Sequence, residues 1–200
     1  MHNGHLRSAL ELVQRLKLAQ LHMIPCADPA HRDTPLASAE HRAAMVELAL
    51  GGDSALVCDR RELHREGYSY TIDSLIELRQ ELGHERSICL IMGCDALLSI
   101  SSWHRWNELL DFANVVVIAR PGWQLPTQGL IADWLVSNAC AGVRGLHHRS
   151  AGAILVEELR PLPISASEIR QLVKNGQSAR FLLPESVITY ILNHGLYTEN

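Results

Sequence analysis

Short apolar runs of strand length, separated by segments with helical spacing, are the feature that most restricts the folds open to this chain. The runs occupy residues 21–24, 55–58, 87–92, 114–119 and 154–156. The last three do not alternate with polar residues, which is typical of parallel strands buried on both faces of a sheet. Apolar residues three and four positions apart predict helices over residues 4–18, 38–50, 71–82 and 184–195. The alternation predicts an α/β fold with a Rossmann-like, doubly wound parallel sheet.

Length and charge exclude several classes of protein. With 200 residues, 47% of them hydrophobic, the chain is long enough to form one domain with a substantial core, over residues 1–200. Its 18 basic and 22 acidic residues give a formal net charge of −4, so binding of nucleic acid through a broad basic surface is not expected. No apolar stretch approaches the roughly 18 residues that a membrane span requires, so no membrane association is expected.

The cysteines and the N-terminus both indicate a cytoplasmic protein. The five cysteines are an odd number, contain no Cys-x-x-Cys motif and are not joined by histidines in a zinc pattern. We therefore expect reduced thiols, with Cys58 and Cys89 in the core because they lie in apolar runs. The first residues lack the basic and then apolar design of a secretory signal.

The chain opens directly on a helix, although the helix of a βαβ unit normally follows a strand. We therefore expect that the first β-strand of the sheet belongs upstream of Met1. Without that strand the neighbouring strands would have unpaired backbone groups, each costing roughly 1–3 kcal/mol. We expect the chain by itself to be a marginal fold and a poor enzyme.

The motif His2-x-Gly4-His5 lies where the first helix begins. Unpaired N–H groups and the helix dipole favour an anion there, and two imidazoles could donate hydrogen bonds to phosphate oxygens. Two exposed histidines at a frayed terminus are the simpler interpretation. A metal site is a third, but no further ligand stands at a convincing spacing.

The segment from Ile164 to Arg170 predicts a second helix start. Ser165 and Glu168 match the S-x-x-E capping box, which is by itself a sufficient explanation for both residues. Arg170 follows one turn into the helix, so hydroxyls, a helix N-terminus and a guanidinium could together clamp a phosphate. Capping alone and capping with phosphate binding both remain open.

Three further features are candidates for binding, each with an ordinary structural alternative. His31 and Arg32 lie in a long loop over residues 25–37, where a solvated basic pair is the alternative. Asp95 follows a buried strand, where ligands bind in parallel sheets, but a turn or helix cap is equally compatible. Trp103 and Trp106, three apart, predict two core side chains on one helical face, of which one could stack on an aromatic ligand.

Together these motifs resemble the bacterial nicotinate-nucleotide adenylyltransferases of the HxGH nucleotidylyltransferase superfamily. The resemblance extends over nearly the whole chain and is carried by residues 2–7, 24–32, 68–75, 92–96, 103–106, 120–122, 164–170 and 181–197. The HxGH motif marks only the superfamily. The segment Ser-Tyr-Thr-Ile-Asp, together with Gly93-x-Asp95 and the tryptophan segment, indicates the pyridine-nucleotide branch.

The resemblance implies transfer of an adenylyl group from ATP to nicotinate mononucleotide, giving deamido-NAD and pyrophosphate, a step of NAD biosynthesis. Catalysis would rest on in-line positioning and electrostatic stabilisation, with Mg²⁺ on the ATP phosphates and no residue binding metal directly. The implied partners are ATP and nicotinate mononucleotide, with the enzyme a monomer or homo-oligomer.

The resemblance also assigns roles to residues. The implied catalytic residues are His2, His5 and Arg170. The implied ATP-binding residues are Gly4, Arg32, Ile164, Ser165 and Arg170. The implied substrate-binding residues are Tyr70, Thr71, Asp95, Trp103, His104 and Arg120, with Trp103 stacked on the nicotinate ring and Asp95 holding sugar or metal-bound water.

One departure from the family keeps two alternatives open. Family members carry a strand and a Gly-Gly-Ser/Thr-Phe-Asp-Pro turn just before HxGH, and this segment is absent here. A truncated, non-catalytic nucleotide-binding remnant is therefore one alternative. The other is a different HxGH enzyme such as a pantetheine-phosphate adenylyltransferase, although those chains lack the Tyr-Thr-Ile-Asp and tryptophan segments.

Overall fold

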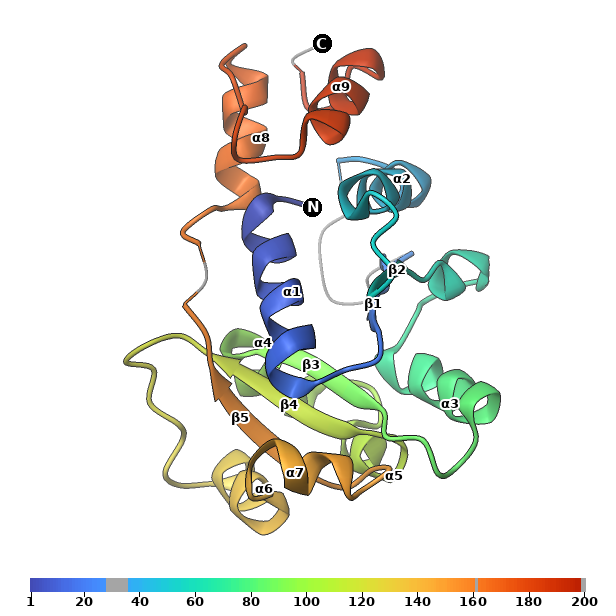
Figure 1. Cartoon of the computed structure of the whole chain (residues 1–200), viewed down its shortest axis with the longest axis vertical. Coiled ribbons are helices and arrows are strands. Elements are labelled where there is room, and N and C mark those ends of the chain that lie inside the picture. The colour runs from blue at the N-terminus through green and yellow to red at the C-terminus, as the bar shows by residue number, and fades with distance from the viewer. Residues whose placement is uncertain (28–35, 161, 199–200) are drawn as a thin grey trace. The chain divides into compact units, whose positions relative to one another are not determined.

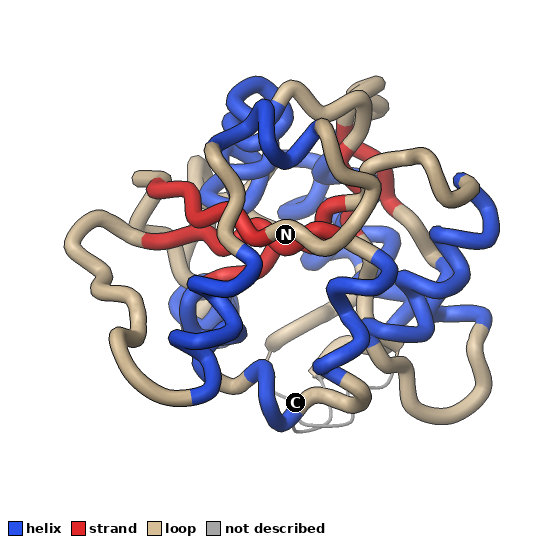
Figure 2. Tube along the Cα trace, turned by 90° about the horizontal axis from the view of Figure 1, so that it is seen from below, coloured by secondary structure: helices blue, strands red, loops and turns tan. Residues whose placement is uncertain are grey.

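The computed structural model describes residues 1–27, 36–160 and 162–198. It divides the chain into two compact units, unit 1 with residues 1–69 and 161–200, and unit 2 with residues 70–160. Each unit combines parallel strands with helices, which confirms the predicted fold class (Figure 1). Helices make up most of the regular structure, and the strands are short (Figure 2). The expectation of one domain over residues 1–200 stays a prediction.

Unit 1 contains a two-stranded parallel sheet and helices from both ends of the chain. Its elements are α1 (Asn3–Leu16), β1 (Leu21–Met23), α2 (Ala39–Leu50), β2 (Leu56–Cys58), α8 (Ala166–Lys174) and α9 (Glu185–Asn193). In the sheet, Leu21 is paired with Leu56 and Met23 with Cys58. The predicted limits of α2 hold because the Ser38 hydroxyl caps its start and Gly51 ends it at a φ of +60°.

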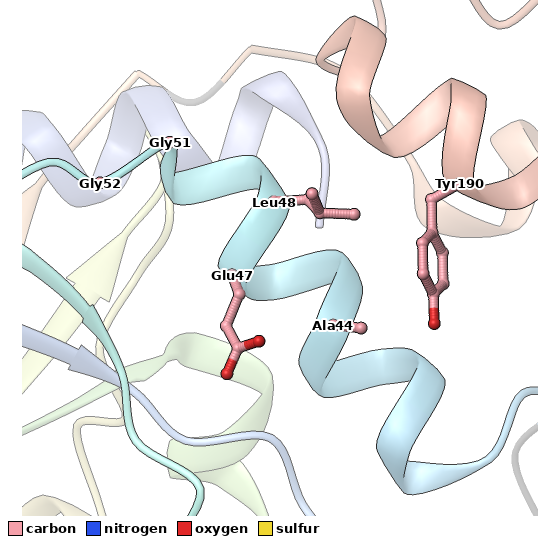
Figure 3. Close-up of a pocket in the computed structure, with 6 residues that line it drawn as sticks. All are labelled: Ala44, Glu47, Leu48, Gly51, Gly52 and Tyr190. Carbon is pink, nitrogen blue, oxygen red and sulfur yellow. The ribbon is translucent and has the colours of Figure 1, made fainter.

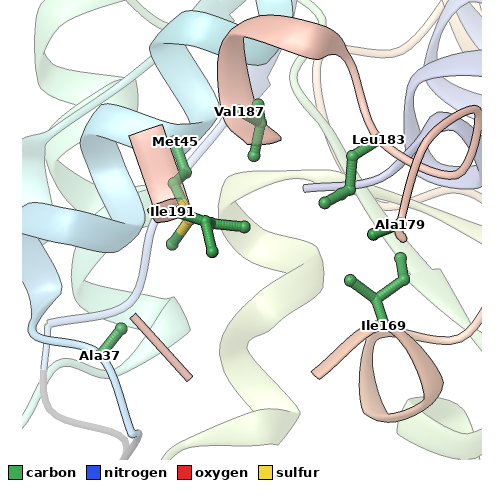
Figure 4. Close-up of a cluster of buried hydrophobic side chains, with 7 residues drawn as sticks. All are labelled: Ala37, Met45, Ile169, Ala179, Leu183, Val187 and Ile191. Atoms are coloured by element: carbon green, nitrogen blue, oxygen red, sulfur yellow. The ribbon is translucent and has the colours of Figure 1, made fainter. Parts of the chain in front are cut away.

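The apolar core of unit 1 joins segments that are far apart in sequence. Met45 of α2 packs with Ile169 of α8 and with Val187 and Ile191 of α9 (Figure 4). The cluster also contains Ala37, Ala179 and Leu183. Because α8 and α9 pack on α2 through this cluster, the C-terminal helices belong to the same unit as the first 69 residues.

Unit 2 is built on a three-stranded parallel sheet in the order β3-β4-β5. Its elements are α3 (Thr71–Leu82), β3 (Cys89–Gly93), α4 (Cys94–Leu98), α5 (Leu109–Phe112), β4 (Asn114–Ala119), α6 (Leu130–Asn138), α7 (Gly142–His147) and β5 (Ile154–Glu158). The central strand β4 holds Val115, Val116 and Val117, all without solvent exposure. Burial on both sides explains why this strand shows no alternation in the sequence.

Buried polar side chains form hydrogen bonds that join the ends of these elements. Arg79 of α3 is 5% exposed and donates to the carbonyls of Gly83 at 3.0 Å, Phe112 at 3.1 Å and Ser150 at 2.9 Å. Asn114, fully buried, accepts the N–H of Ala153 at 2.9 Å. Backbone carbonyl and N–H groups that would otherwise be buried without partners are satisfied in this way.

The structure corrects several expectations. Among the described residues the strands form two separate parallel sheets, in the orders β1-β2 and β3-β4-β5. Cys58 and Cys89 are only partly buried, whereas Cys94 is buried. All three lie at strand positions or directly after a strand, but an apolar run does not by itself specify how deeply each member is covered.

None of the described helices is long and apolar enough to cross a membrane.

Candidate functional site

His2 is the N-cap of α1 and is only 6% exposed. Its carbonyl accepts the N–H groups of His5 at 2.9 Å and Leu6 at 3.1 Å. Its Nδ1 accepts the same His5 N–H at 3.3 Å, so the ring proton belongs on Nε2. With the proton on Nε2, His2 can donate a hydrogen bond through that atom. The interpretation as a frayed terminus is wrong for this residue.

The imidazole of His5 stacks on that of His2, with ring centroids 3.7 Å apart and an interplanar angle of 18°. Burial, with smaller contributions from His5 and the N-terminal ammonium, lowers the pKa of His2 from 6.5 to about 4. Desolvation and the same ammonium lower the pKa of His5 as well. At neutral pH the stacked pair is therefore uncharged and acts through hydrogen bonds rather than through a fixed positive charge.

Gly4 leaves room for the His2 ring. A Cβ atom at this position would lie 3.0 Å from Nδ1 and 3.2 Å from Cε1 of His2, and 3.3 Å from the carbonyl oxygen of Leu162. These separations are shorter than an ordinary van der Waals contact of about 3.5–4.0 Å. Glycine is thus needed for packing within the protein, in addition to the close approach of a ligand that the sequence suggests.

The start of α8 lies beside the start of α1 (Figure 1). The Leu162 carbonyl that packs against Gly4 also accepts the N–H of Ile164 at 2.8 Å. Ser165 follows as the N-cap of α8, with its hydroxyl accepting the N–H of Ser167 at 3.3 Å. The expected capping box would use Glu168 instead, so that detail is corrected: at this helix the serine reaches the N–H two residues on.

Arg170 is oriented by the same helix turn. Its Nη2 donates to the Ser167 hydroxyl at 3.3 Å, and its side chain is partly exposed. Ser165 and the first turn of α8 are exposed. Unit 1 therefore brings together His2, Gly4, Ile164, Ser165 and the first turns of α1 and α8. The anion site that the sequence indicates here stays a prediction.

Asn3, which the sequence analysis did not single out, ties this site to the segment between α8 and α9. Its backbone N–H donates to the carbonyl of Leu182 at 2.9 Å, and its side-chain amide donates to the carbonyl of Phe181 at 2.8 Å. No local sequence signal reveals a bond between residues 178 positions apart.

Unit 2 brings Tyr70 and His104 together. Tyr70 is the N-cap of α3, and its ring centroid lies 4.3 Å from that of His104, at an interplanar angle of 32°. Thr71 is the first residue of the helix, and no side chain caps its start. This open helix start leaves backbone N–H groups beside two polar aromatic rings.

The tryptophan segment is not one helix. Trp103 ends a 3₁₀ turn (Ile100–Ser102), and Trp106 begins the next (Trp106–Glu108). Arg105 between them has a φ of +51° and holds Glu108 through bonds of 2.8 and 2.6 Å. The prediction of two tryptophans on one helical face is therefore wrong, because the left-handed residue breaks the periodicity. Trp106 packs on Trp134, and Trp103 is partly exposed.

Asp95 and Arg120 follow neighbouring strands. Gly93 at the end of β3 is paired with Ile118 in β4, and the Cys94 thiol donates to the Ile118 carbonyl at 3.1 Å. Asp95 is the second residue of α4 and Arg120 follows β4, and both are exposed. Both thus lie at the carboxyl end of the unit 2 sheet, where ligands bind in parallel α/β proteins.

The predicted residues divide between the two units according to their predicted substrate. His2, Gly4, His5, Ile164, Ser165 and Arg170 belong to unit 1, and Tyr70, Thr71, Asp95, Trp103, His104 and Arg120 belong to unit 2. His31 and Arg32 lie outside the described residues. Within the described ranges, no three His, Cys, Asp or Glu side chains are grouped so as to hold a metal ion.

A separate depression of about 500 Å³ lies on unit 1 (Figure 3). Its lining residues are Ala44, Glu47, Leu48, Gly51, Gly52 and Tyr190. It contains none of the predicted site residues. The candidate site is therefore defined by the two helix starts rather than by this hollow.

The sequence of this chain is similar to those of known proteins. The cytidylyltransferase-like family matches residues 1–172. A probable nicotinate-nucleotide adenylyltransferase of Hahella chejuensis is 44% identical over 98% of this chain and 90% of its own length. The corresponding protein of Cellvibrio japonicus is 47% identical over 98% of this chain and 93% of its own length.

Solved structures show the same fold. The nicotinic acid mononucleotide adenylyltransferase of Plasmodium falciparum, complexed with NaAD, aligns with a TM-score of 0.71 at 16% identity. The alignment covers 98% of this chain and 91% of that one. A putative nicotinate-nucleotide adenylyltransferase from Vibrio parahaemolyticus aligns with a TM-score of 0.60 at 14% identity, covering 100% of this chain and 89% of that one.

Proposed function

Since the chain belongs to the cytidylyltransferase-like family and groups there with the nicotinate-nucleotide adenylyltransferases, we propose that it transfers an adenylyl group from ATP to nicotinate mononucleotide. A phosphate oxygen of the mononucleotide attacks the α-phosphorus of ATP, and a new P–O–P bond forms. The bond between the α-phosphorus and the bridging oxygen breaks, and pyrophosphate leaves with that electron pair. The products are deamido-NAD and pyrophosphate.

The observation that carries this proposal is the geometry at the start of α1. His2 accepts a backbone N–H through Nδ1, so its Nε2–H is the donor that remains for a phosphate oxygen. His5 is exposed beside it, at the positive end of the helix dipole. Negative charge grows on the phosphates in the transition state, and fixed donors lower its energy without reorganisation.

Binding of the triphosphate changes the electrostatics of these histidines. Both are neutral in the free protein because desolvation lowers their pKa. An anionic triphosphate near them favours the protonated form. His5, the exposed member of the pair, gains a proton more readily than the buried His2, so we assign the positive charge of the loaded site to His5.

The second helix start supplies the opposite side of the triphosphate site. Ser165 and the first turn of α8 offer a hydroxyl and backbone N–H groups, and Ile164 is held beside them by its bond to Leu162. Arg170 adds a guanidinium one turn into the helix. Arg32 joins this group in our proposal on the basis of its sequence position alone.

The residues that we assign to nicotinate mononucleotide lie in unit 2. In our proposal Trp103 stacks on the nicotinate ring, and backbone groups at Thr71 and His104 receive its carboxylate. Tyr70 orients His104 by ring contact. Asp95 and Arg120, at neighbouring strand ends, bind the ribose and the phosphate.

Magnesium enters with ATP as part of the substrate. In our proposal its ligands are mainly the phosphate oxygens of ATP. Mg²⁺ is commonly held by substrate phosphates with few protein ligands, and keeps several waters. We propose that the residues at the starts of α1 and α8 position this metal–ATP complex.

The decisive experiment measures which acceptor the protein uses. The purified chain is incubated with ATP, Mg²⁺ and either nicotinate mononucleotide or 4′-phosphopantetheine, and the adenylylated product is quantified by chromatography. Deamido-NAD with the first acceptor and no product with the second supports the proposal. Product with phosphopantetheine alone would refute it. ATP binding without product from either acceptor would instead indicate a nucleotide-binding protein without this activity.

A further inference from the structure

A second pair of histidines lies where α9 packs on α2. His41 is the third residue of α2, and His194 is the C-cap of α9. Their ring centroids are 5.1 Å apart, and the ring planes are inclined to one another by 58°. Neither residue takes part in the sites proposed for ATP and nicotinate mononucleotide, so the pair requires an explanation of its own.

Both histidines are held on rigid elements. The N–H of His41 donates to the hydroxyl of Ser38 at 3.2 Å. The N–H of His194 donates to the carbonyl of Tyr190 at 3.1 Å. The two helices are packed together by the buried apolar cluster shown in Figure 4. Side chains on packed helices keep their spacing, which is a condition for a preformed binding site.

The separation and tilt of these rings suit the binding of one shared metal ion. The lone pair of an imidazole nitrogen lies in the plane of the ring, so two rings can share an ion only where their planes meet. With Zn–N bonds of about 2.0–2.1 Å and a tetrahedral angle, the centroids of two such rings lie roughly 5 Å apart. His41 and His194 satisfy both conditions. The stacked rings of His2 and His5, 3.7 Å apart at 18°, do not, because nearly parallel planes keep the lone pairs apart.

Tyr190 provides the outer contact that is typical of a metal-binding histidine. Its hydroxyl lies 2.9 Å from Nδ1 of His41, and Figure 3 shows the side chain beside α2. With the proton on Nδ1, His41 donates to that oxygen and keeps the lone pair of Nε2 for a metal. Histidines that bind metals usually donate their other N–H in this way, which fixes the tautomer and the orientation of the ring. The Tyr190 ring also lies 4.2 Å from that of His194, between centroids, so it contacts both histidines.

We propose that His41 and His194 bind one divalent transition-metal ion of the Zn²⁺ class between α2 and α9. Neutral imidazole is a preferred ligand of Zn²⁺, Ni²⁺ and Cu²⁺, whereas Mg²⁺ prefers oxygen ligands, so this site is distinct from that of the metal–ATP complex. Water fills the remaining coordination positions. His194 is exposed and His41 is partly buried, so the ion reaches the pair from solvent.

The ion has a structural role at this position. It joins α9 to α2, and it binds only when the two helices are packed as in the folded chain. A ligand that binds the folded state and not the unfolded one stabilises the fold by mass action. Zn²⁺ should therefore raise the melting temperature of the protein in a concentration-dependent way.

The test titrates Zn²⁺ into the full chain and into its variants by isothermal calorimetry, with circular dichroism to verify folding. Tyr190→Phe, which keeps the ring and loses the hydroxyl, should weaken binding about tenfold, as removal of an outer contact commonly does. His41→Ala and His194→Ala should each weaken binding more, because a direct ligand is lost, and should abolish the rise in melting temperature. Excess Mg²⁺ should not displace Zn²⁺.

A matched control separates this site from the other histidines of the chain. His147 and His148 are exposed and lie at the end of α7 in unit 2. Adjacent positions on a helix do not face one another, so these two rings should not share an ion. The double variant His147→Ala/His148→Ala should therefore keep the Zn²⁺ affinity of the unaltered chain. Because His194 is exposed, His194→Ala leaves no cavity and decides the question even where His41→Ala fails to fold.

Several results would overturn the inference. One is a His194→Ala protein that binds Zn²⁺ and gains thermal stability as the unaltered chain does. Another is loss of binding in His147→Ala/His148→Ala, which would place the ion in unit 2. A third is dimerisation of the unaltered chain on addition of Zn²⁺, detected by sedimentation and absent in His194→Ala, because the ion would then join two copies. None of these measurements uses ATP or nicotinate mononucleotide, so this inference and the proposed function can fail independently.

Discussion

The substitution Gly4→Ala tests how closely the packing around His2 controls both stability and turnover. The added Cβ would lie 3.0 Å from the Nδ1 of His2 and 3.3 Å from the Leu162 carbonyl oxygen. Against an ordinary contact of about 3.5 Å or more, the neighbours must move by about 0.2–0.5 Å. The bond from the His5 N–H to that same Nδ1 is already 3.3 Å long, so such a shift weakens the cap.

The expected free energies can be added from these contacts. Overpacking costs roughly 1–3 kcal/mol, and loss of an N-cap costs about 1 kcal/mol. Alanine gains about 1 kcal/mol over glycine within a helix, and Gly4 is helical. The balance is a destabilisation of about 1–3 kcal/mol. For a chain of this length that corresponds to a decrease in melting temperature of roughly 2–12 °C.

Gly4→Ala should lower turnover more than its destabilisation of the fold would explain. Moving His2 displaces its Nε2–H donor, and loss of one such donor costs about 10²-fold in kcat. The assay is deamido-NAD formation, beside thermal unfolding of the same samples. Gly145→Ala is the matched control, because it is also a glycine inside a helix, where a Cβ meets the Cys140 side chain at 3.3 Å and no histidine. A Gly4→Ala protein that is more stable than wild type and equally active would refute the argument.

Three further outcomes are expected. His5→Ala should lower kcat by about 10²-fold while circular dichroism and the melting temperature stay near wild type, because the exposed His5 ring leaves no cavity when its donor to the phosphates and its stack on His2 are lost; near-normal turnover in the folded variant would exclude the role. Trp103→Ala should raise the KM for nicotinate mononucleotide more than that for ATP, whereas a lower melting temperature with both KM values unchanged would identify Trp103 as a packing residue. For His2, the folded-state pKa of about 4 lies below the ordinary 6.5, so the unfolded chain binds the extra proton first and stability falls as the pH drops from 6.5 to 4. Denaturant titrations should show a loss on the order of 3 kcal/mol over that range. His2→Asn, a residue that can still cap the helix, should reduce this loss, and the same pH dependence in the variant would contradict the assignment.

The sequence by itself determined several elements of this protein. The helix predicted over residues 71–82 is α3, with the same limits, and the strand predicted over residues 114–119 is β4. Both are encoded locally, because helical and extended backbones bring different positions of the same segment to one face. The glycine at position 83 and the apolar run of β4 are visible without knowledge of any other part of the chain.

The sequence also identified most of the residues that the structure groups at the two helix starts. His2, Gly4 and His5 are recognisable by spacing, and Ser165 is recognisable as a helix cap. The protonation of these residues could not be predicted from the sequence. Which nitrogen of His2 carries the proton, and why its pKa is low, depends on burial and on the bond to the His5 N–H.

Only the tertiary structure decided the contacts between distant segments. Asn3 bonds to Phe181 across 178 residues, and Gly4 packs against the carbonyl of Leu162. Neither contact leaves a periodic signal, because each depends on how α1 and the C-terminal segment fold into one unit. The positive φ of Phe181 shows the reason most directly: its own preference opposes that conformation, and the bonds from Asn3 together with the buried residues on either side impose it.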